Sequence, residues 1–168
     1  MQGIVLVGGL PGSGKSFFAS RLADAAGAIY LSSDKLRKAM AASGKYTRED
    51  KLAVYRALAG RVEEAKGNAW VVVDATFSHR DMRNIFFDLA AKLSVPCVFI
   101  WLYADETLVK ERLAKPRPDS EADYAVYEIL RDAFEAIETP HVTLESTNDN
   151  VDTLLKTGLN LMRDHETT

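Results

Sequence analysis

The chain has 168 residues, of which 47% are hydrophobic and 27% charged, and its formal net charge is −3. A chain of this size and composition fits one globular domain, residues 1–168, whose core needs neither disulfides nor a structural metal. Twelve acids against three bases in residues 119–168 argue against a general coat for nucleic acid.

The first predicted element is a strand, GIVLV at residues 3–7. The N-terminus before it has no basic region, and its apolar run is too short for a signal peptide or a membrane span. We therefore expect a cytoplasmic protein without a membrane partner.

A phosphate-binding motif follows directly, since GLPGSGKS, Gly9–Ser16, matches G-x-x-x-x-G-K-[ST] in full. Glycines permit a tight wrap that points several backbone N–H groups at one phosphate chain. Lys15 supplies a positive charge for the β and γ oxygens, and the Ser16 hydroxyl is a ligand for Mg²⁺. The next helix, KSFFASRLADAA, directs its positive N-terminal end at the same phosphates.

The position of this motif, with a strand before it and a helix after it, favours a nucleotide-binding loop over an incidental glycine-rich turn. A GTPase is expected to carry N-K-x-D late in the chain, and the nearest segment, STNDN at 146–150, lacks the lysine. We therefore expect ATP, and because the chain is too short for most motors, a small kinase. The residues expected to bind ATP are Gly9, Pro11, Gly12, Ser13, Gly14, Lys15, Ser16 and Phe17.

The second predicted strand, AIYL at 28–31, leads to Asp34 and, three residues later, to Arg37. Ligands gather beyond the carboxyl ends of parallel strands, where Asp34 would meet an acceptor hydroxyl in front of the phosphate loop. If a helix begins near Ser33, Asp34 and Arg37 share one face and supply a proton acceptor and a cation. Alternatively, Ser33 or Asp34 caps this helix, which does not exclude catalysis.

The segment 35–66 is basic, with nine Lys or Arg against four acids. It permits a phosphorylated or polyanionic substrate, although solvated helix faces also explain most of these charges. Tyr46 and Tyr55 are candidates for stacking on a base or an aromatic acceptor, and helix packing explains Tyr55 as well.

The third predicted strand, AWVVV at 69–73, ends in Asp74. Apolar residues followed by a carboxylate form the Walker B pattern, in which the aspartate approaches the Mg²⁺ shell directly or through water. A turn-forming aspartate is the alternative. Arg80 and Arg83, at the start of the next helix, are further candidates for the acceptor site.

The fourth predicted strand, CVFIWLY at 97–103, contains the single cysteine, Cys97, which we expect to be a buried and inert thiol. The helix DETLVKERLAK follows, and then the loop 114–123, where small kinases place a lid over the ATP phosphates. Arg117 is the candidate to close over the phosphates, and Arg112 is a candidate to bind ATP. A solvated loop arginine and a helix-surface arginine are the alternatives.

A helix over ADYAVYEILRDAF, a strand HVTLE at 141–145 and a last helical stripe from Val151 to Met162 complete the chain. Near-continuous apolar runs that alternate with helical spacing predict an α/β fold. Its parallel sheet is expected to be covered by helices on both faces, with right-handed crossovers.

The order of GLPGSGKS, a strand, D-x-x-R and VVVDATFSHRDMR resembles the polynucleotide-kinase-like P-loop kinases, with zeta-toxin-type and chloramphenicol kinases more distant. The resemblance covers roughly residues 1–145 and implies a P-loop NTPase fold of nucleoside-kinase type, with a five-stranded parallel sheet in the order 2-3-1-4-5. It also implies that Asp34 is the general base, that Arg37 is the acceptor-site cation and that Thr76 helps to bind substrate. Phage-type enzymes tend to carry an asparagine where this chain has Phe77 and Ser78, which weakens the case for nucleic-acid ends.

These features predict an ATP- and Mg²⁺-dependent phosphotransferase that acts on a hydroxyl of a small molecule or on a polynucleotide 5′-OH end. Its expected catalytic residues are Lys15, Asp34, Arg37 and Arg117, and the expected metal ligands are Ser16 and Asp74. The alternative is an ATP-binding regulatory or adaptor module with little or no transfer activity. No obligate protein partner is evident.

Overall fold

The computed structural model describes residues 1–40, 47–65, 67–116 and 122–166. Five strands form one parallel sheet in the order β2-β3-β1-β4-β5, which confirms the predicted fold. The strands are β1 (Gly3–Gly8), β2 (Ile29–Ser32), β3 (Trp70–Asp74), β4 (Cys97–Tyr103) and β5 (Val142–Glu145). The described helices are α1 (Lys15–Ala26), α2 (Ser33–Ala39), α3 (Arg48–Glu64), α4 (Arg80–Leu93), α5 (Glu106–Leu113), α6 (Tyr124–Asp132) and α7 (Val151–Glu166).

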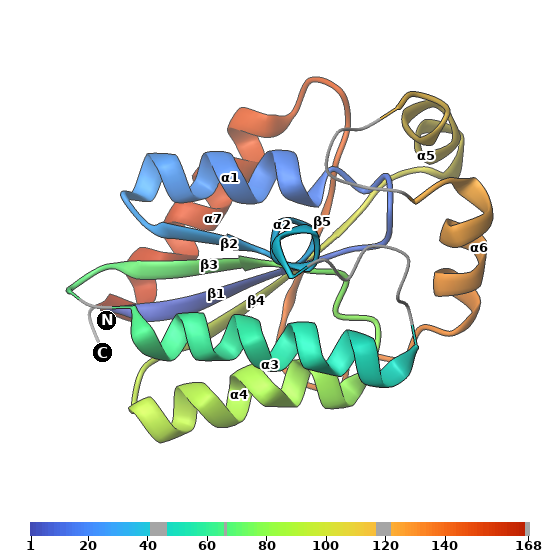
Figure 1. Cartoon of the computed structure of the whole chain (residues 1–168). Helices are drawn as coiled ribbons and strands as arrows, with labels where there is room; N and C mark the ends of the chain where they lie inside the picture. Colours follow the sequence, from blue (N-terminus) through green and yellow to red (C-terminus); the bar gives the residue numbers. More distant parts are fainter. Residues whose placement is uncertain (41–46, 66, 117–121, 167–168) are drawn as a thin grey trace.

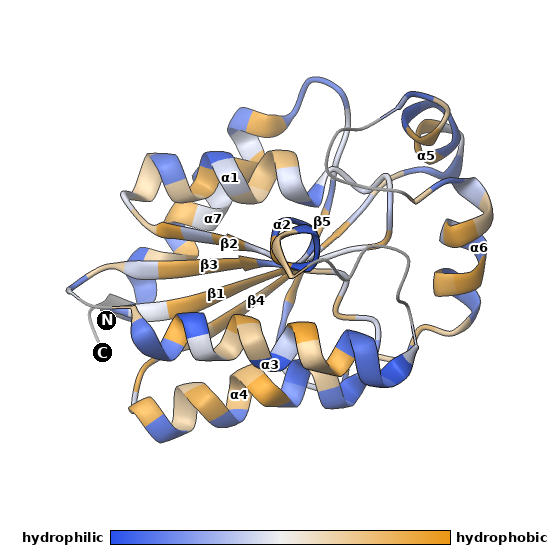
Figure 2. Ribbon diagram, in the orientation of Figure 1, coloured by the Kyte–Doolittle hydropathy of each residue, from blue (hydrophilic) through white to orange (hydrophobic). Residues whose placement is uncertain are grey.

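The sheet lies between two helical layers, with α1 and α7 on one face and α3 and α4 on the other (Figure 1). Side chains alternate along β1: Val5 and Val7 join the cluster under α1 and α7, whereas Ile4 and Leu6 join the cluster under α3 and α4. All four are fully buried, and burial stabilises each by about 2 kcal/mol. The hydropathy colouring shows the same arrangement, with apolar strands between helices that are polar on their outer sides (Figure 2).

Helices α5 and α6 lie beyond the carboxyl ends of the strands rather than on a face of the sheet (Figure 1). They form a small core of their own, in which Val109 and Leu113 of α5 contact Tyr127 of α6, with Leu10 packed against it. The loop after β1 is thereby connected to this pair of helices. None of the described helices combines the length and the apolarity needed to cross a bilayer.

Three element ends that differ from the predicted ranges matter here, and two of them lie at the site. Strands β2 and β3 each end one residue later than predicted, so Ser32 and Asp74 are paired terminal residues of neighbouring strands. The helix expected to run to residue 134 ends at Asp132, and Phe134 packs on Trp101 of β4, with 4.7 Å between ring centroids. Helical spacing alone could not show that Phe134 contacts the sheet.

Candidate active site

The loop between β1 and α1 has the backbone geometry of a phosphate cradle. Gly14 adopts the left-handed φ of 83°, which other residues rarely do, and α1 begins directly after it at Lys15. A Cβ on Gly9 would lie 2.6 Å from the carbonyl oxygen of Leu102, so the loop approaches β4 closely. Because the N-cap residue is glycine, it offers no side chain to the first N–H groups of α1, which suits an anionic ligand.

The side chains that follow this loop differ in exposure. Lys15 is buried, with 9% of its surface exposed, whereas Ser16 is open to solvent. Phe17 is exposed as well, and the guanidinium of Arg21 lies 3.4 Å from its ring centroid. The aromatic ring of Phe17 therefore contacts Arg21 on the surface of α1, which leaves its backbone as the part suited to a phosphate.

Asp74 ends β3 with only 2% of its surface exposed. Its Oδ2 accepts a 2.8 Å hydrogen bond from the hydroxyl of Tyr30, and its buried Oδ1 has no hydrogen-bond partner among the described residues. Burial raises the pKa of the Asp74 carboxyl, while the Lys15 charge and the Ser16 and Tyr30 hydroxyls oppose the shift. The charge of Asp34 raises the pKa further. Lys15, Ser16 and Asp34 therefore all act on the carboxyl group of Asp74.

The unpaired oxygen of Asp74 and the hydroxyl of Ser16, which acts on the same carboxyl group, are the kind of oxygen donors that Mg²⁺ requires. No group of three His, Cys, Asp or Glu side chains that could enclose a metal occurs within residues 1–40, 47–65, 67–116 and 122–166. Mg²⁺ usually binds through one or two protein ligands, substrate phosphates and water rather than in an all-protein cage. Ser16 and Asp74 therefore fit a magnesium ion that is shared with a nucleotide.

The predicted base and cation both lie on α2, which Figure 1 shows between α1 and α3 at the β2 edge of the sheet. The helix cap is Ser32, whose Oγ accepts from the Lys35 N–H at 3.4 Å, so the expectation that Ser33 or Asp34 caps the helix is wrong. Asp34 occupies the first turn, and Arg37 is buried in the last. Asp34 is therefore not needed as a cap and stays available for other chemistry.

Tyr55 of α3 lies within the electrostatic reach of Asp34, Arg37 and Asp74. Burial raises the pKa of the Tyr55 hydroxyl, and the charges of Asp34, Arg37 and Asp74 all act on it. The hydroxyl accepts a 2.9 Å hydrogen bond from the N–H of Phe77. Tyr55 is therefore a packing residue, with 4% exposure, rather than a stacking platform. Tyr46, the other stacking candidate, lies outside the described residues.

The loop after Asp74 is held in an uncommon conformation. Phe77 has a left-handed φ of 53°, which is costly for a residue with a side chain, and it is fully buried. The carbonyl oxygen of Phe77 accepts a 2.9 Å hydrogen bond from the Nη1 of Arg83, and the N–H of Phe77 donates to Tyr55. Thr76, the predicted substrate-binding residue, lies between Asp74 and this fixed position and is partly exposed.

The two arginines of α4, predicted as candidates for the acceptor site, bond the segment after α6. Arg83 has 2% exposure, and its second guanidinium nitrogen donates to the carbonyl oxygen of Ala136 at 2.9 Å. Arg80 forms a 2.6 Å ion pair with Glu138, and its N–H donates to Glu135. Both arginines tie the segment after α6 to the start of α4, so the structure gives these two acceptor candidates a structural role.

Arg112 of α5 lies against the phosphate loop. Its Nη1 donates to the carbonyl oxygen of Gly12 at 3.0 Å and to the Oγ of Ser146 at 2.9 Å. The Ser146 hydroxyl donates in turn to the carbonyl oxygen of Ser13 at 2.5 Å. Ser146 was not among the predicted site residues, because the segment STNDN was compared only with the guanine-binding motif. Arg117, the predicted lid residue, and the segment 117–121 lie outside the described residues.

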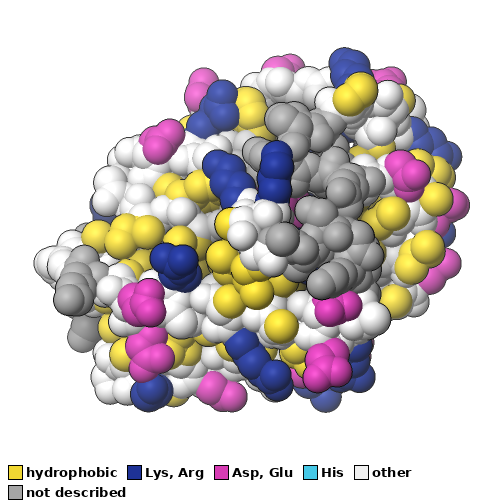
Figure 3. Space-filling view, viewed as in Figure 1, with side chains coloured by type: hydrophobic (Ala, Val, Ile, Leu, Met, Phe, Trp, Pro, Cys, Tyr) yellow, Lys and Arg dark blue, Asp and Glu magenta, His cyan; other side chains and the backbone are white. Residues whose placement is uncertain are grey.

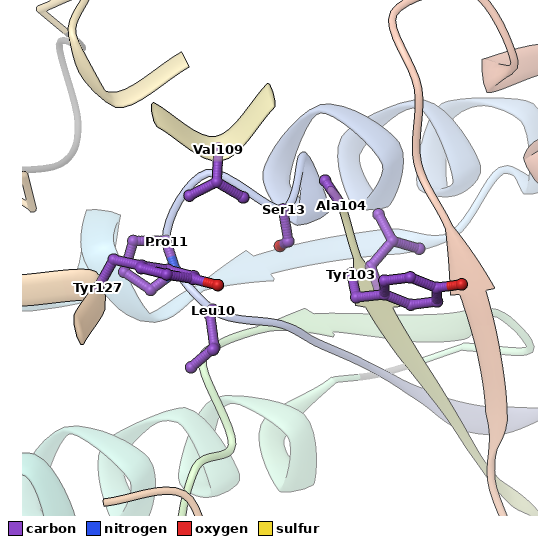
Figure 4. A pocket seen from close by; sticks show the side chains of 8 residues that line it. Leu10, Pro11, Ser13, Tyr103, Ala104, Val109 and Tyr127 are labelled. Carbon is purple, nitrogen blue, oxygen red and sulfur yellow. The ribbon is translucent and has the colours of Figure 1, made fainter. Parts of the chain in front are cut away.

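Beside the loop is a small pocket of about 30 Å³, a volume suited to a water molecule rather than to a nucleotide (Figure 4). The buried Ser13 hydroxyl faces this space and has no partner among the described residues. Its lining residues are Leu10, Pro11, Ser13, Leu102, Tyr103, Ala104, Val109 and Tyr127. The pocket thus lies between the phosphate loop and the α5–α6 pair.

Comparison with known proteins agrees with the observed fold. Residues 4–137 match the model of the family described as AAA domain. The solved gluconokinase of Sinorhizobium meliloti 1021 is similar at 20% identity and a TM-score of 0.74, with 99% of this chain and 95% of that chain covered.

Two nucleotide complexes are similar as well. The Mycobacterium tuberculosis APS kinase CysC, in complex with AMPPNP and APS, has a TM-score of 0.77 at 18% identity, with 96% of this chain and 97% of that chain covered. Chaetomium thermophilum Kti12, in complex with ADP-AlF3, has a TM-score of 0.73 at 17% identity, with 96% and 98% covered. At these identities the likeness establishes the shared fold.

Proposed function

The chain belongs to the AAA domain family, and from this premise we propose that it is an ATP- and Mg²⁺-dependent kinase that transfers the γ-phosphoryl group to a hydroxyl. The observation that carries the proposal is the buried Asp74, whose Oδ1 has no hydrogen-bond partner among the described residues and whose carboxyl group is acted on by Lys15, Ser16 and Asp34. A buried carboxylate without full pairing is costly, which favours a functional reason for keeping it.

Each residue has one role in this proposal. The loop N–H groups and Lys15 hold the triphosphate, and Ser16 with Asp74 would hold Mg²⁺, which when bound neutralises charge on the phosphates. Asp34 accepts the proton of the acceptor hydroxyl, and Arg37 positions the acceptor. Phosphoryl transfer needs little more than this, because positioning and electrostatic stabilisation supply most of the catalysis.

We further propose a small molecule as the acceptor, within a polynucleotide-kinase-like branch of these kinases. The similar structures include a gluconokinase and an APS kinase, both named for small-molecule substrates. The net charge of −3 also disfavours a polyanionic acceptor. The closure of Arg117 over the phosphates stays a prediction.

The test is an acceptor screen with labelled ATP that includes sugars, nucleosides, aminoglycosides and 5′-OH oligonucleotides, carried out on wild type and three variants. We expect Asp34→Asn to lower transfer at least about a hundredfold while ATP still binds, because general-base catalysis is lost. Lys15→Ala should lose both binding and transfer. Asp88→Asn, a change at an exposed acid of α4, is the matched control and should behave as wild type.

Full transfer by Asp34→Asn with every acceptor would refute the assignment of the base. The adaptor alternative needs the same loop, so ATP binding does not distinguish the two functions. It predicts a protein partner captured only with nucleotide bound, and no phosphorylated acceptor in the screen. That pair of results would replace the kinase proposal.

A further inference from the structure

Tyr30 connects the edge strand of the sheet to the carboxylate at the end of β3. Its hydroxyl donates to the Oδ2 of Asp74 at 2.8 Å, although the two residues are 44 positions apart in sequence. The register of β2 and β3 pairs Ser32 with Asp74, so Tyr30 reaches the carboxylate from two residues before the strand end. The strand pairing therefore sets the direction of this hydrogen bond.

Tyr30 is itself held in place from two sides. Its ring is partly buried against the cluster under α1 and α7. The ammonium of Lys35, on α2, lies 5.1 Å from the ring centroid, within the range of a cation–π contact. The tyrosine thus touches both the sheet and the helix that carries Asp34.

The hydrogen bond makes the two oxygens of Asp74 different from each other. Oδ2 is occupied by Tyr30, while the buried Oδ1 has no partner among the described residues. A carboxylate that accepts a hydrogen bond at one oxygen cannot rotate about its Cβ–Cγ bond without breaking that hydrogen bond. A group that donates a hydrogen bond to the oxygen of a carboxylate that does not bind the metal orients the carboxylate. Loss of such a group weakens metal binding.

We propose that Tyr30 is the positioning residue of Asp74: its hydroxyl holds Oδ2, so that Oδ1 is directed at the magnesium shell next to Ser16. This inference rests on the proposed function, because it needs a Mg²⁺–nucleotide complex at the loop. It adds a residue that the phosphate-loop and Walker B patterns do not contain.

The experiment measures binding rather than turnover. The affinity for a fluorescent ATP analogue is titrated against Mg²⁺ concentration, and again in EDTA, for wild type and Tyr30→Phe. Phenylalanine keeps the ring and removes only the hydroxyl, so we expect the half-saturating Mg²⁺ concentration to rise about tenfold. The affinity in EDTA and the melting temperature should stay as in wild type.

Tyr124→Phe is the matched control. The Tyr124 hydroxyl, on α6, also donates to a carboxylate, but to that of Glu106 on α5 rather than to Asp74. It should leave the Mg²⁺ dependence unchanged. In an Asp74→Asn background, Tyr30→Phe should have no further effect on Mg²⁺ dependence, since both changes act through the same carboxylate. If Tyr30→Phe melts far below wild type, this double-variant comparison decides the question.

An unchanged Mg²⁺ dependence in folded Tyr30→Phe would overturn the inference and leave the kinase proposal intact. A fall of the affinity in EDTA by the same factor as in Mg²⁺ would overturn it too, because the tyrosine would then support the loop in general. Failure of the proposed function looks different: wild type itself would bind no nucleotide, or would bind it without any response to Mg²⁺.

Discussion

The carboxyl group of Asp74 shows at the level of one residue how function and stability compete in this protein. It is buried at a strand end, where a charge with one unpaired oxygen is expensive to keep. Lys15, Ser16 and Tyr30 offset part of that cost, and a bound cation would offset more. An apolar residue would serve the fold better here, so the carboxylate is better explained by ligand binding than by packing.

Cys97 shows the opposite case, a residue whose surroundings suppress its chemistry. Its side chain packs against the core under α3 and α4, and burial raises the pKa of the thiol to about 12. A thiol reagent at pH 8 should therefore react slowly with the native protein and rapidly after unfolding, when the pKa returns to about 8.5. Absorbance of the thiol reagent, with and without denaturant, measures both rates.

The same shift predicts a pH dependence of stability. The pKa of the Cys97 thiol is higher in the folded than in the unfolded protein, so the protonated thiol favours the folded state. This contribution to the free energy of unfolding is fully present below about pH 8.5 and is lost as the pH rises towards about 12. Cys97→Ala should remove this part of the alkaline loss of stability. Rapid labelling of the native thiol at pH 8 would contradict the burial argument.

At the level of elements, the phosphate loop depends on contacts from two distant parts of the chain. Arg112 on α5 and Ser146 after β5 both bond the backbone carbonyls of the loop. The loop therefore has a conformation that is supported before any ligand binds, which lowers the entropic cost of binding. This differs from the prediction that Arg112 binds ATP directly, and the two roles can be separated.

We expect Arg112→Ala to weaken ATP binding about tenfold, because the loop loses the hydrogen bond to the Gly12 carbonyl and the support of Ser146. Arg112→Lys should also weaken binding, since a single ammonium loses the Nη2 contact with Asn148 at 3.4 Å and is held less rigidly than the planar guanidinium. Ser146→Ala should give a smaller loss in the same direction. Isothermal titration calorimetry with ATP measures all three, and Lys110→Ala, on an exposed position of the same helix, is the control.

Wild-type affinity in Arg112→Lys together with a loss in Arg112→Ala would favour a direct charge contact with the phosphates. The role of the arginine would then be the one that sequence analysis assigned. Equal affinity of all the variants would show that the loop needs neither contact.

At the level of the whole molecule, charge is arranged unevenly. Figure 3 shows several Lys and Arg side chains near the middle of the face that carries α1 and α2, and acidic and basic side chains interspersed towards its margin. A central basic area suits the phosphates of a nucleotide, whereas acids interspersed around it disfavour a long polyanion that would have to pass over them. This arrangement agrees with a nucleotide and a small acceptor.

We therefore expect transfer to the best small-molecule acceptor to change little between about 50 and 200 mM KCl, since few counterions are released on binding. Binding of a 5′-OH oligonucleotide should be weak at both concentrations. Initial rates and fluorescence anisotropy, respectively, measure these two properties. A tight oligonucleotide complex whose affinity falls steeply with salt would instead identify a nucleic-acid acceptor.

Local patterns predicted the elements near the phosphate loop well, because each depends on adjacent residues. The β1–loop–α1 unit is encoded within Gly3–Ala26, and the apolar strands are recognisable without their neighbours. The strand order came from a resemblance and not from spacing, since no local pattern says which strands pair. The role of Arg83 was missed for the same reason: its partners are the carbonyl oxygens of Phe77 and Ala136, the second 53 residues away.

By itself the sequence determined the α/β class, the phosphate loop and the residue types available for metal and proton transfer, because these depend on short-range spacing and side-chain chemistry. Only the tertiary structure decided which of those residues meet. The pairing of β2 with β3 brings Tyr30 to Asp74, and the placing of α5 beyond the sheet brings Arg112 to the loop. Such contacts join residues 44 and 100 positions apart, and the packing of the whole chain, not its local preferences, determines them.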